Sequence, residues 1–205
     1  LVHELNRRGR DDVVVVDDLT DGRKFTNIAS ARIADYLDVE EFRQWFSTDR
    51  SPYENIERIY HLGACSSTTE WDGRMMLDKN YAYSRDLINF CVNREIPIVY
   101  ASSAAIYGGS AKFSEDLENE KPLNVYGYSK RLVDRYVIRQ LARVKSQVVG
   151  LRYFNVYGPR EQHKGTMASV AFHFSQQLKI SAVINLFEGC HGLDPGEQSR
   201  DFVYV

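Results

Sequence analysis

The sequence predicts an α/β protein built on a doubly wound parallel sheet. Two observations favour this fold: short apolar segments that fit buried strands, and segments with helical spacing between them that are long enough for crossovers. Parallel neighbours require such crossovers, so the alternation indicates a parallel sheet. We expect strands at 13–16, 56–62, 97–103 and 147–154, and helices at 39–46, 80–92, 126–144 and 167–178.

Each strand is marked by an apolar run with polar boundaries. Residues 13–16 are four consecutive valines enclosed by aspartates, as in a strand buried on both faces of a sheet. In segment 97–103 the buried stretch runs from Ile98 to Ala101. The helices are marked by apolar residues that recur every three to four positions.

Composition excludes several classes of protein. With 205 residues, 43% of them apolar, the chain can bury one main core. A net charge of −2 argues against nucleic acid as a partner. No apolar run approaches the roughly 18 residues of a membrane span, and the start is no signal peptide, so no membrane association is expected. The three cysteines lack the paired spacing of a metal or redox site, which indicates reduced thiols in a cytoplasmic protein.

Ligands of such sheets bind at the carboxyl ends of the strands, so the loops there form the candidate site. After the valine strand, Asp17 and Asp18 are placed to accept hydrogen bonds from the adenosine ribose of NAD. Lys24 in the same loop would instead neutralise the 2′-phosphate of NADP. A solvated turn around Asp21 and Gly22 would also account for these residues.

The strongest local signal is a tyrosine and a lysine four residues apart on a predicted helix. Tyr126 and Lys130 share one helix face, and Ser103 follows a buried strand from which its hydroxyl can reach the same ligand. By itself the pair also fits the start of a surface helix. The small-residue turn 63–67 after another strand would let a ligand approach the backbone closely.

The chemistry explains this choice of residues. A phenol with a pKa near 10 is a poor base, but Lys130 and an oxidised nicotinamide are both cationic and would lower it. Tyr126 would then take the proton of an alcohol while its hydride passes to the nicotinamide, and Lys130 would hold the nicotinamide ribose.

Four longer motifs are specific enough to indicate a family. They are GACSSTTEWDG (63–73), YASSAAIYGG (100–109), EKPLNVYGYSK (120–130), and RYFNVYGPRE followed by HKGTMASVAFH (152–173). With these motifs the chain resembles the extended short-chain dehydrogenases and, among them, the ADP-glycero-manno-heptose 6-epimerase family. The resemblance implies a Rossmann-like homo-oligomer, a pentamer, that holds NADP tightly and inverts C6 of a nucleotide-linked heptose for lipopolysaccharide core synthesis.

The resemblance also implies residue roles. Tyr126 matches the first catalytic base, Lys164 the second, Ser103 the supporting hydroxyl and Lys130 the cofactor-binding lysine. The implied cofactor contacts are Asp17, Asp18, Lys24, Leu62, Gly63, Ala64, Cys65, Ser66, Asn80, Lys130 and Val156. The implied substrate contacts are Asn155, Thr166, His173, Phe187, Glu188, Gly189, Cys190 and Arg200. Two departures from the family bear on cofactor affinity: the family's lysine near Val39 is missing here, and Lys79 stands in place of an asparagine.

A second base is also expected from geometry, because inversion returns hydride to the opposite carbonyl face and needs a proton donor there. Lys164 follows the fourth strand in a loop beside Gly165, where a plain surface lysine is equally compatible. His163 is a rival for the role. His173, on an apolar helix face, also fits a core histidine.

The two ends of the chain look like interior parts of a longer protein. Residues 1–8 are typical of the last turns of a helix, and 201–205 (DFVYV) are typical of a strand. We therefore expect that the first strand, its glycine-rich phosphate loop and most of a small substrate domain lie outside the chain. Residues 1–165 would form the catalytic domain, 166–205 would begin the substrate region, and this piece alone would be inactive.

Three other functions stay open at this point. A 4-epimerase or a 4,6-dehydratase of the same superfamily is the nearest, although Ser103 is followed by Ala104 and Ala105 where the dehydratases carry an acidic pair. A redox sensor that binds the dinucleotide without turnover would be expected to lack the tyrosine or the lysine.

Overall fold

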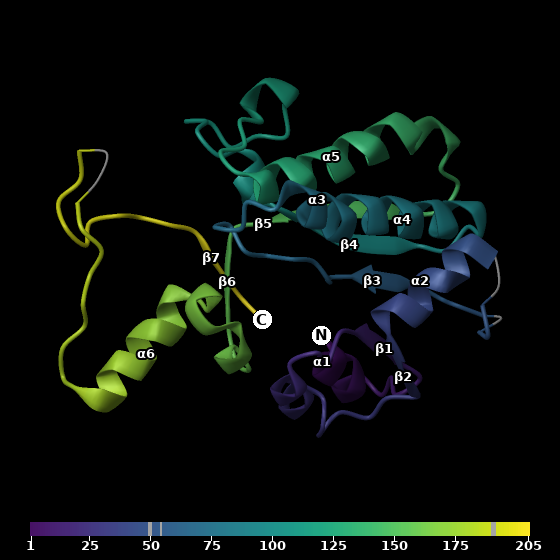
Figure 1. Cartoon of the computed structure of the whole chain (residues 1–205), viewed down its shortest axis with the longest axis horizontal. Helices are drawn as coiled ribbons and strands as arrows, with labels where there is room; N and C mark the ends of the chain where they lie inside the picture. Colours follow the sequence, from purple (N-terminus) through teal and green to yellow (C-terminus); the bar gives the residue numbers. More distant parts are fainter. Residues whose placement is uncertain (49–50, 54, 190–191) are drawn as a thin grey trace.

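The computed structural model describes residues 1–48, 51–53, 55–189 and 192–205 (Figure 1). The strands are β1 (Val14–Asp17), β2 (Asp35–Asp38), β3 (Ile59–His61), β4 (Ile98–Ser103), β5 (Val148–Tyr153), β6 (Asn155–Tyr157) and β7 (Phe202–Tyr204). The α-helices are α1 (Val2–Arg7), α2 (Val39–Thr48), α3 (Gly73–Met76), α4 (Tyr83–Asn93), α5 (Val125–Gln140) and α6 (Val170–Ile180). Short 3₁₀ turns include η1 (Gly22–Asn27), η3 (Ala104–Ile106), η4 (Leu117–Asn119), η5 (Leu141–Arg143) and η6 (Gln162–Met167), and η2 (Leu77–Ala82) is a π-helical turn.

Every strand pairing in the described ranges is parallel, as the sequence predicts. β4 lies between β3 and β5, β1 pairs with β2, and β6 pairs with β7. α5 packs on β4 and on α4, and α2 packs on α4 and on β1 and β2. The catalytic lysine and tyrosine predicted from the sequence therefore lie on a helix that covers the central strand of the three-stranded sheet (Figure 1).

The hydrophobic core lies between these helices and the strands they cover. Leu87 and Cys91 of α4 are one helical turn apart and pack with Ile98 of β4, which is fully buried. α2 adds Phe42 and Trp45, whose ring centroids are 4.8 Å apart in an edge-to-face contact. This core fixes α4 and α5 against β4, whose carboxyl end carries the candidate site.

The four predicted strands and four predicted helices are all present, with boundaries that differ by a few residues. The predicted strand at 201–205 is β7, and the predicted helix end at 1–8 is α1. Two strands were not predicted. β2 has the sequence DYLD, in which only Leu37 is buried, and β6 is a three-residue strand formed by pairing with β7. Both are too short and too polar to produce a period-two pattern.

Two further findings bear on the expectations about membrane spans and cysteines. None of the helices in the described parts of the chain is long and apolar enough to cross a membrane. Cys65 and Cys91 are free thiols. Cys190 lies outside the described residues.

Candidate active site

The first turn of α5 is held against the strand end that carries Ser103. Asn124 caps the helix, and its Oδ1 accepts a hydrogen bond from the Gly127 N–H at 2.8 Å. Gly127 is buried against η3: a Cβ there would lie 2.5 Å from the Ala105 carbonyl oxygen. Because only glycine permits this approach, the residue next to Tyr126 sets how close the tyrosine comes to β4.

We expect Gly127→Ala to lower the free energy of unfolding by about 1–3 kcal/mol. Overpacking against a main-chain carbonyl outweighs the roughly 1 kcal/mol that alanine gains over glycine in a helix. Gly63→Ala is the matched control, because a Cβ at Gly63 meets no atom within 4 Å. Denaturant unfolding of both variants measures the difference, and a Gly127 variant as stable as wild type would show that α5 shifts without cost.

The structure brings Tyr126 and Ser103 together. Ser103 ends β4, and its Oγ accepts the Ala105 N–H at 3.1 Å while also hydrogen bonding with the Tyr126 phenol. Burial raises the pKa of Tyr126, and the hydrogen bond with Ser103 acts in the opposite direction. The phenol of the protein alone is therefore protonated at neutral pH.

Lys130 follows one turn later on the same helix face. Its side chain is buried, and its Nζ donates to the Ala101 carbonyl oxygen of β4 at 2.9 Å. Burial lowers the pKa of Lys130 to about 8, while the Asp134 carboxylate opposes the shift. Lys130 thus keeps its positive charge at neutral pH, within reach of the strand end that carries Ser103.

A buried ionic network that the sequence analysis did not single out supports this helix. The Asp134 carboxylate accepts hydrogen bonds from Tyr100 Oη at 3.0 Å, from Ser102 Oγ at 2.9 Å and from Arg152 Nε at 2.9 Å. Arg152 in turn donates to the buried Glu120 at 2.6 Å. The available signal was the acid four residues after Lys130, which lies on the same helix face. The network joins α5, β4 and β5 beneath the candidate site.

The loop after β1 brings together Asp17, which predicts NAD, and Lys24, which predicts NADP. Lys24 Nζ lies 2.9 Å from Asp17 Oδ1, so the cation predicted to bind a phosphate and the acid predicted to bind a ribose neutralise each other. Tyr36 Oη donates to the Asp17 carbonyl oxygen at 2.7 Å. Hydrogen bonds from Thr20 to the carboxylate hold the pKa of Asp18 below its usual range.

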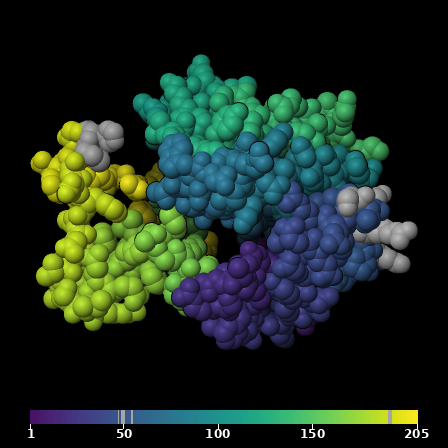
Figure 2. All heavy atoms as spheres, viewed as in Figure 1, coloured from purple at the N-terminus to yellow at the C-terminus, as the bar shows by residue number. Residues whose placement is uncertain are grey.

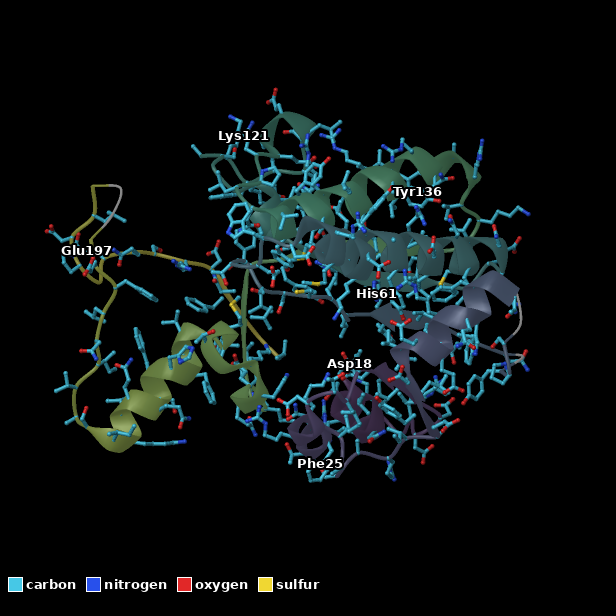
Figure 3. All side chains as sticks on the ribbon, in the orientation of Figure 1. Asp18, Phe25, His61, Lys121, Tyr136 and Glu197 are labelled. Atoms are coloured by element: carbon cyan, nitrogen blue, oxygen red, sulfur yellow. The ribbon has the colours of Figure 1, made fainter. Side chains whose placement is uncertain are left out.

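The loop after β3 exposes most of its residues, whereas Asn80 lies behind it. Residues 62–64 and Ser66 are exposed, and Cys65 is half-buried. Asn80 is fully buried, and its side-chain amide bonds both main-chain groups of Cys65. Asp18 and His61 mark the ends of β1 and β3 that flank this region (Figure 3). The Asn80 side chain therefore lies behind this loop, and its contact with the cofactor stays a prediction.

Lys164 lies apart from the tyrosine. It is exposed in η6, and among the described residues no hydrogen bond or ion pair joins it to Tyr126 or Lys130. Its rival His163 is engaged elsewhere: Nδ1 lies 3.0 Å from Asn27 Nδ2, at the end of η1. The structure thus places the predicted first base, Tyr126, near Ser103 and on one helix face with Lys130, whereas Lys164, the predicted second base, lies on a separate loop.

The predicted substrate residues are spread along the C-terminal part of the chain. Asn155 Nδ2 donates to the Asp201 carbonyl oxygen at 3.0 Å, and the Arg200 guanidinium lies 5.7 Å from the centre of the Phe187 ring. His173 is half-buried on α6 beside another aromatic ring. The remaining residues are half-buried Val156 in β6, predicted to contact the cofactor, and exposed Thr166, Glu188 and Gly189; Cys190 lies outside the described residues.

Comparison with known proteins supplies the family. Residues 1–205, the whole chain, match the NAD dependent epimerase/dehydratase family. The chain belongs to this family. An ADP-L-glycero-D-manno-heptose-6-epimerase of Alkalilimnicola ehrlichii is 58% identical over all 205 residues, and the chain spans 64% of that relative's length. The resemblance predicted from the four motifs is therefore confirmed.

Solved structures of two epimerases share the fold. An ADP-L-glycero-D-manno-heptose-6-epimerase of Helicobacter pylori is 30% identical with a TM-score of 0.79, over 94% of this chain and 60% of that one. A UDP-glucose 4-epimerase of Thermotoga maritima is 25% identical with a TM-score of 0.74, over 99% of this chain and 64% of that one. The doubly wound, Rossmann-like parallel fold predicted from the sequence is confirmed.

Proposed function

We propose that this chain is part of an isomerase that inverts C6 of an ADP-glycero-manno-heptose by transient oxidation and reduction. The observation that carries the proposal is the cluster of Ser103, Tyr126 and Lys130 at the carboxyl end of β4. It occurs in a chain that shares 58% identity with a relative of that name. A hydroxyl pair beside a buried ammonium is suited to oxidising an alcohol.

NADP is the cofactor we propose, with NAD as the alternative. The residues fit a dinucleotide: the described contacts of Lys130 use one of its three N–H groups, which leaves donors for ribose hydroxyls. The exposed loop 62–66 permits close approach to its main chain, and Lys24 lies in the loop where a 2′-phosphate would be recognised. When bound, the dinucleotide supplies the acceptor and then the donor of hydride.

In the proposed mechanism each side chain handles one proton or one hydroxyl. Tyr126 removes the proton of the C6 hydroxyl while Ser103 hydrogen bonds to the same oxygen. Lys130 orients the cofactor ribose, and its charge lowers the pKa of the tyrosine. Lys164 gives a proton to the C6 oxygen when hydride returns to the opposite face. The implied substrate contacts around Asn155 and α6 would hold the heptose.

The choice between NADP and NAD is tested at Lys24. We expect Lys24→Ala to weaken NADP binding about 10- to 100-fold and NAD binding far less, because only NADP offers a charge-assisted contact to the ammonium. Arg23→Ala is the matched control, since this neighbouring cation is exposed and pairs with Asp21. Equal losses for both cofactors in calorimetric titrations would leave Asp17 as the dominant contact.

Two assays separate the proposed activity from its rivals. Mass spectrometry of the ligand released by denaturation identifies the dinucleotide, and turnover of ADP-glycero-manno-heptose against UDP-hexoses identifies the sugar. A dehydratase reaction is disfavoured because Ala104 and Ala105 follow Ser103, which leaves no acid there to expel water. A dinucleotide-binding sensor would turn over none of these sugars.

The setting of the enzyme is part of the proposal. We place it in the cytoplasm, in lipopolysaccharide core synthesis, as a homo-oligomer and specifically a pentamer. Residues 1–165 would be the catalytic domain and 166–205 the start of the substrate region. Residues around α6 form a lobe beside the remainder of the molecule, which supports this division, while β7 returns to pair with β6 (Figure 2).

A further inference from the structure

Asn80 is a fully buried polar side chain that the proposed mechanism does not use. It lies in η2, the π-helical turn between α3 and α4, and this turn packs against α5. Burying an unpaired carboxamide is unfavourable, so the partners of this side chain define its role.

One side of the Asn80 amide holds the loop after β3. Its Oδ1 accepts the Cys65 N–H at 2.8 Å, and its Nδ2 donates to the Cys65 carbonyl oxygen at 2.9 Å. The carboxamide thereby satisfies both main-chain groups of one residue, as a neighbouring strand would. This contact fixes the backbone of the loop without using the Cys65 side chain.

The other side of the amide reaches the helix of the proposed catalytic residues. Nδ2 also lies 3.1 Å from Oγ of Ser129, a fully buried residue on α5. Ser129 Oγ donates in turn to the Tyr126 carbonyl oxygen at 2.7 Å. A continuous chain of hydrogen bonds therefore runs from the Cys65 backbone through two buried side chains to the Tyr126 backbone.

The main chain of Asn80 is fixed as well. Ser84 Oγ donates to the Asn80 carbonyl oxygen at 2.5 Å, and His61 Nε2 lies 2.7 Å from the same hydroxyl. Burial lowers the pKa of His61 to about 3, so the imidazole stays neutral and this support persists through the physiological pH range. Asn80 is therefore held on three sides, by β3, by the loop and by α5.

We infer that Asn80 and Ser129 are positioning residues that set the spacing between the dinucleotide loop 62–66 and Tyr126. The inference rests on the proposed function, because it assigns the loop to the cofactor and the tyrosine to the sugar. Hydride transfer requires the two reactants at near-contact distance, and a shift of about 1 Å can cost on the order of 10²-fold in rate. In this role Asn80, whose side chain is fully buried, acts through the Cys65 and Tyr126 backbones.

The link is tested first without cofactor, by amide hydrogen exchange. We expect Asn80→Ala and the conservative Asn80→Asp to speed exchange of the Cys65 amide at least about tenfold. Cys91→Ala, which truncates an equally buried side chain of the hydrophobic core that forms no part of this chain of hydrogen bonds, should leave that amide unchanged. Unaltered Cys65 exchange in both Asn80 variants would overturn the inference, whatever sugar the enzyme uses.

A double-mutant cycle in the holoenzyme then tests the coupling to chemistry. We expect Asn80→Asp and Ser129→Ala each to lower kcat by about 10- to 100-fold with little change in KM, and the double variant to lose no more than the worse single variant. The Cys91→Ala enzyme should keep its kcat even where its Tm falls. Additive losses, or a loss of kcat that follows Tm in all variants, would overturn the inference. Absence of heptose turnover in the wild-type full-length enzyme would instead refute the proposed function.

Discussion

Replacing Tyr126 with phenylalanine in the full-length enzyme is expected to lower the rate of epimerisation by about 10²–10⁴-fold, the usual contribution of a positioned general base. The substitution removes one oxygen and keeps the ring, so α5 should stay in place against η3. Dinucleotide content should be unchanged, because the cofactor is proposed to be held by Lys130 and the loops after β1 and β3. Stopped-flow turnover and ligand release from denatured protein measure the two quantities separately.

The neighbouring Tyr128 provides the control. It lies on the same helix but is 43% exposed, so Tyr128→Phe should retain wild-type turnover. Ser103→Ala should fall between the two, because the Tyr126 phenol keeps its place and loses one hydrogen-bond partner. Equal activity of the Tyr126 and Tyr128 variants would remove Tyr126 from the mechanism.

The elements of this fold could be predicted where burial imposes a pattern. The valine run at 13–16 becomes β1, and the stretch around Ile98, which is fully buried, becomes β4. β2 could not be predicted, because three of its four residues are not buried and its hydrogen bonds come from pairing with β1. Its existence depends on the neighbouring strand more than on its own side chains.

The residues of the candidate site also differ in whether they could be predicted from the sequence. The residues whose spacing is local, Tyr126 and Lys130, could be placed on one helix face from the sequence. The partners of Asn80 could not, because they come from a loop and a helix far away along the chain. The sequence alone does not indicate which backbone groups the side chain of a buried asparagine will hydrogen bond. The same is true of Asp134, whose partners lie on β4 and β5.

The proposed role of Lys164 as a second base follows from the chemistry of inversion at C6. C6 of a heptose carries a secondary hydroxyl outside the sugar ring, so its oxidation gives a ketone on a bond that can rotate. Rotation about C5–C6 presents the other carbonyl face without releasing the sugar from its pocket. The carbonyl oxygen then changes partners, from Tyr126 and Ser103 to Lys164, and each base serves one epimer.

Lys164→Met is therefore expected to lower epimerisation by about 10²–10⁴-fold while leaving one half-reaction intact. In single turnovers of the oxidised holoenzyme, the epimer served by Tyr126 should still generate reduced nicotinamide absorbance at the wild-type rate, and the other epimer should not. Tyr126→Phe should give the opposite preference. Lys179→Met, which removes an exposed lysine from the end of α6, is the control and should affect neither epimer. If the Lys164 variant oxidises both epimers equally well, a single base serves both faces and Lys164 only binds the sugar.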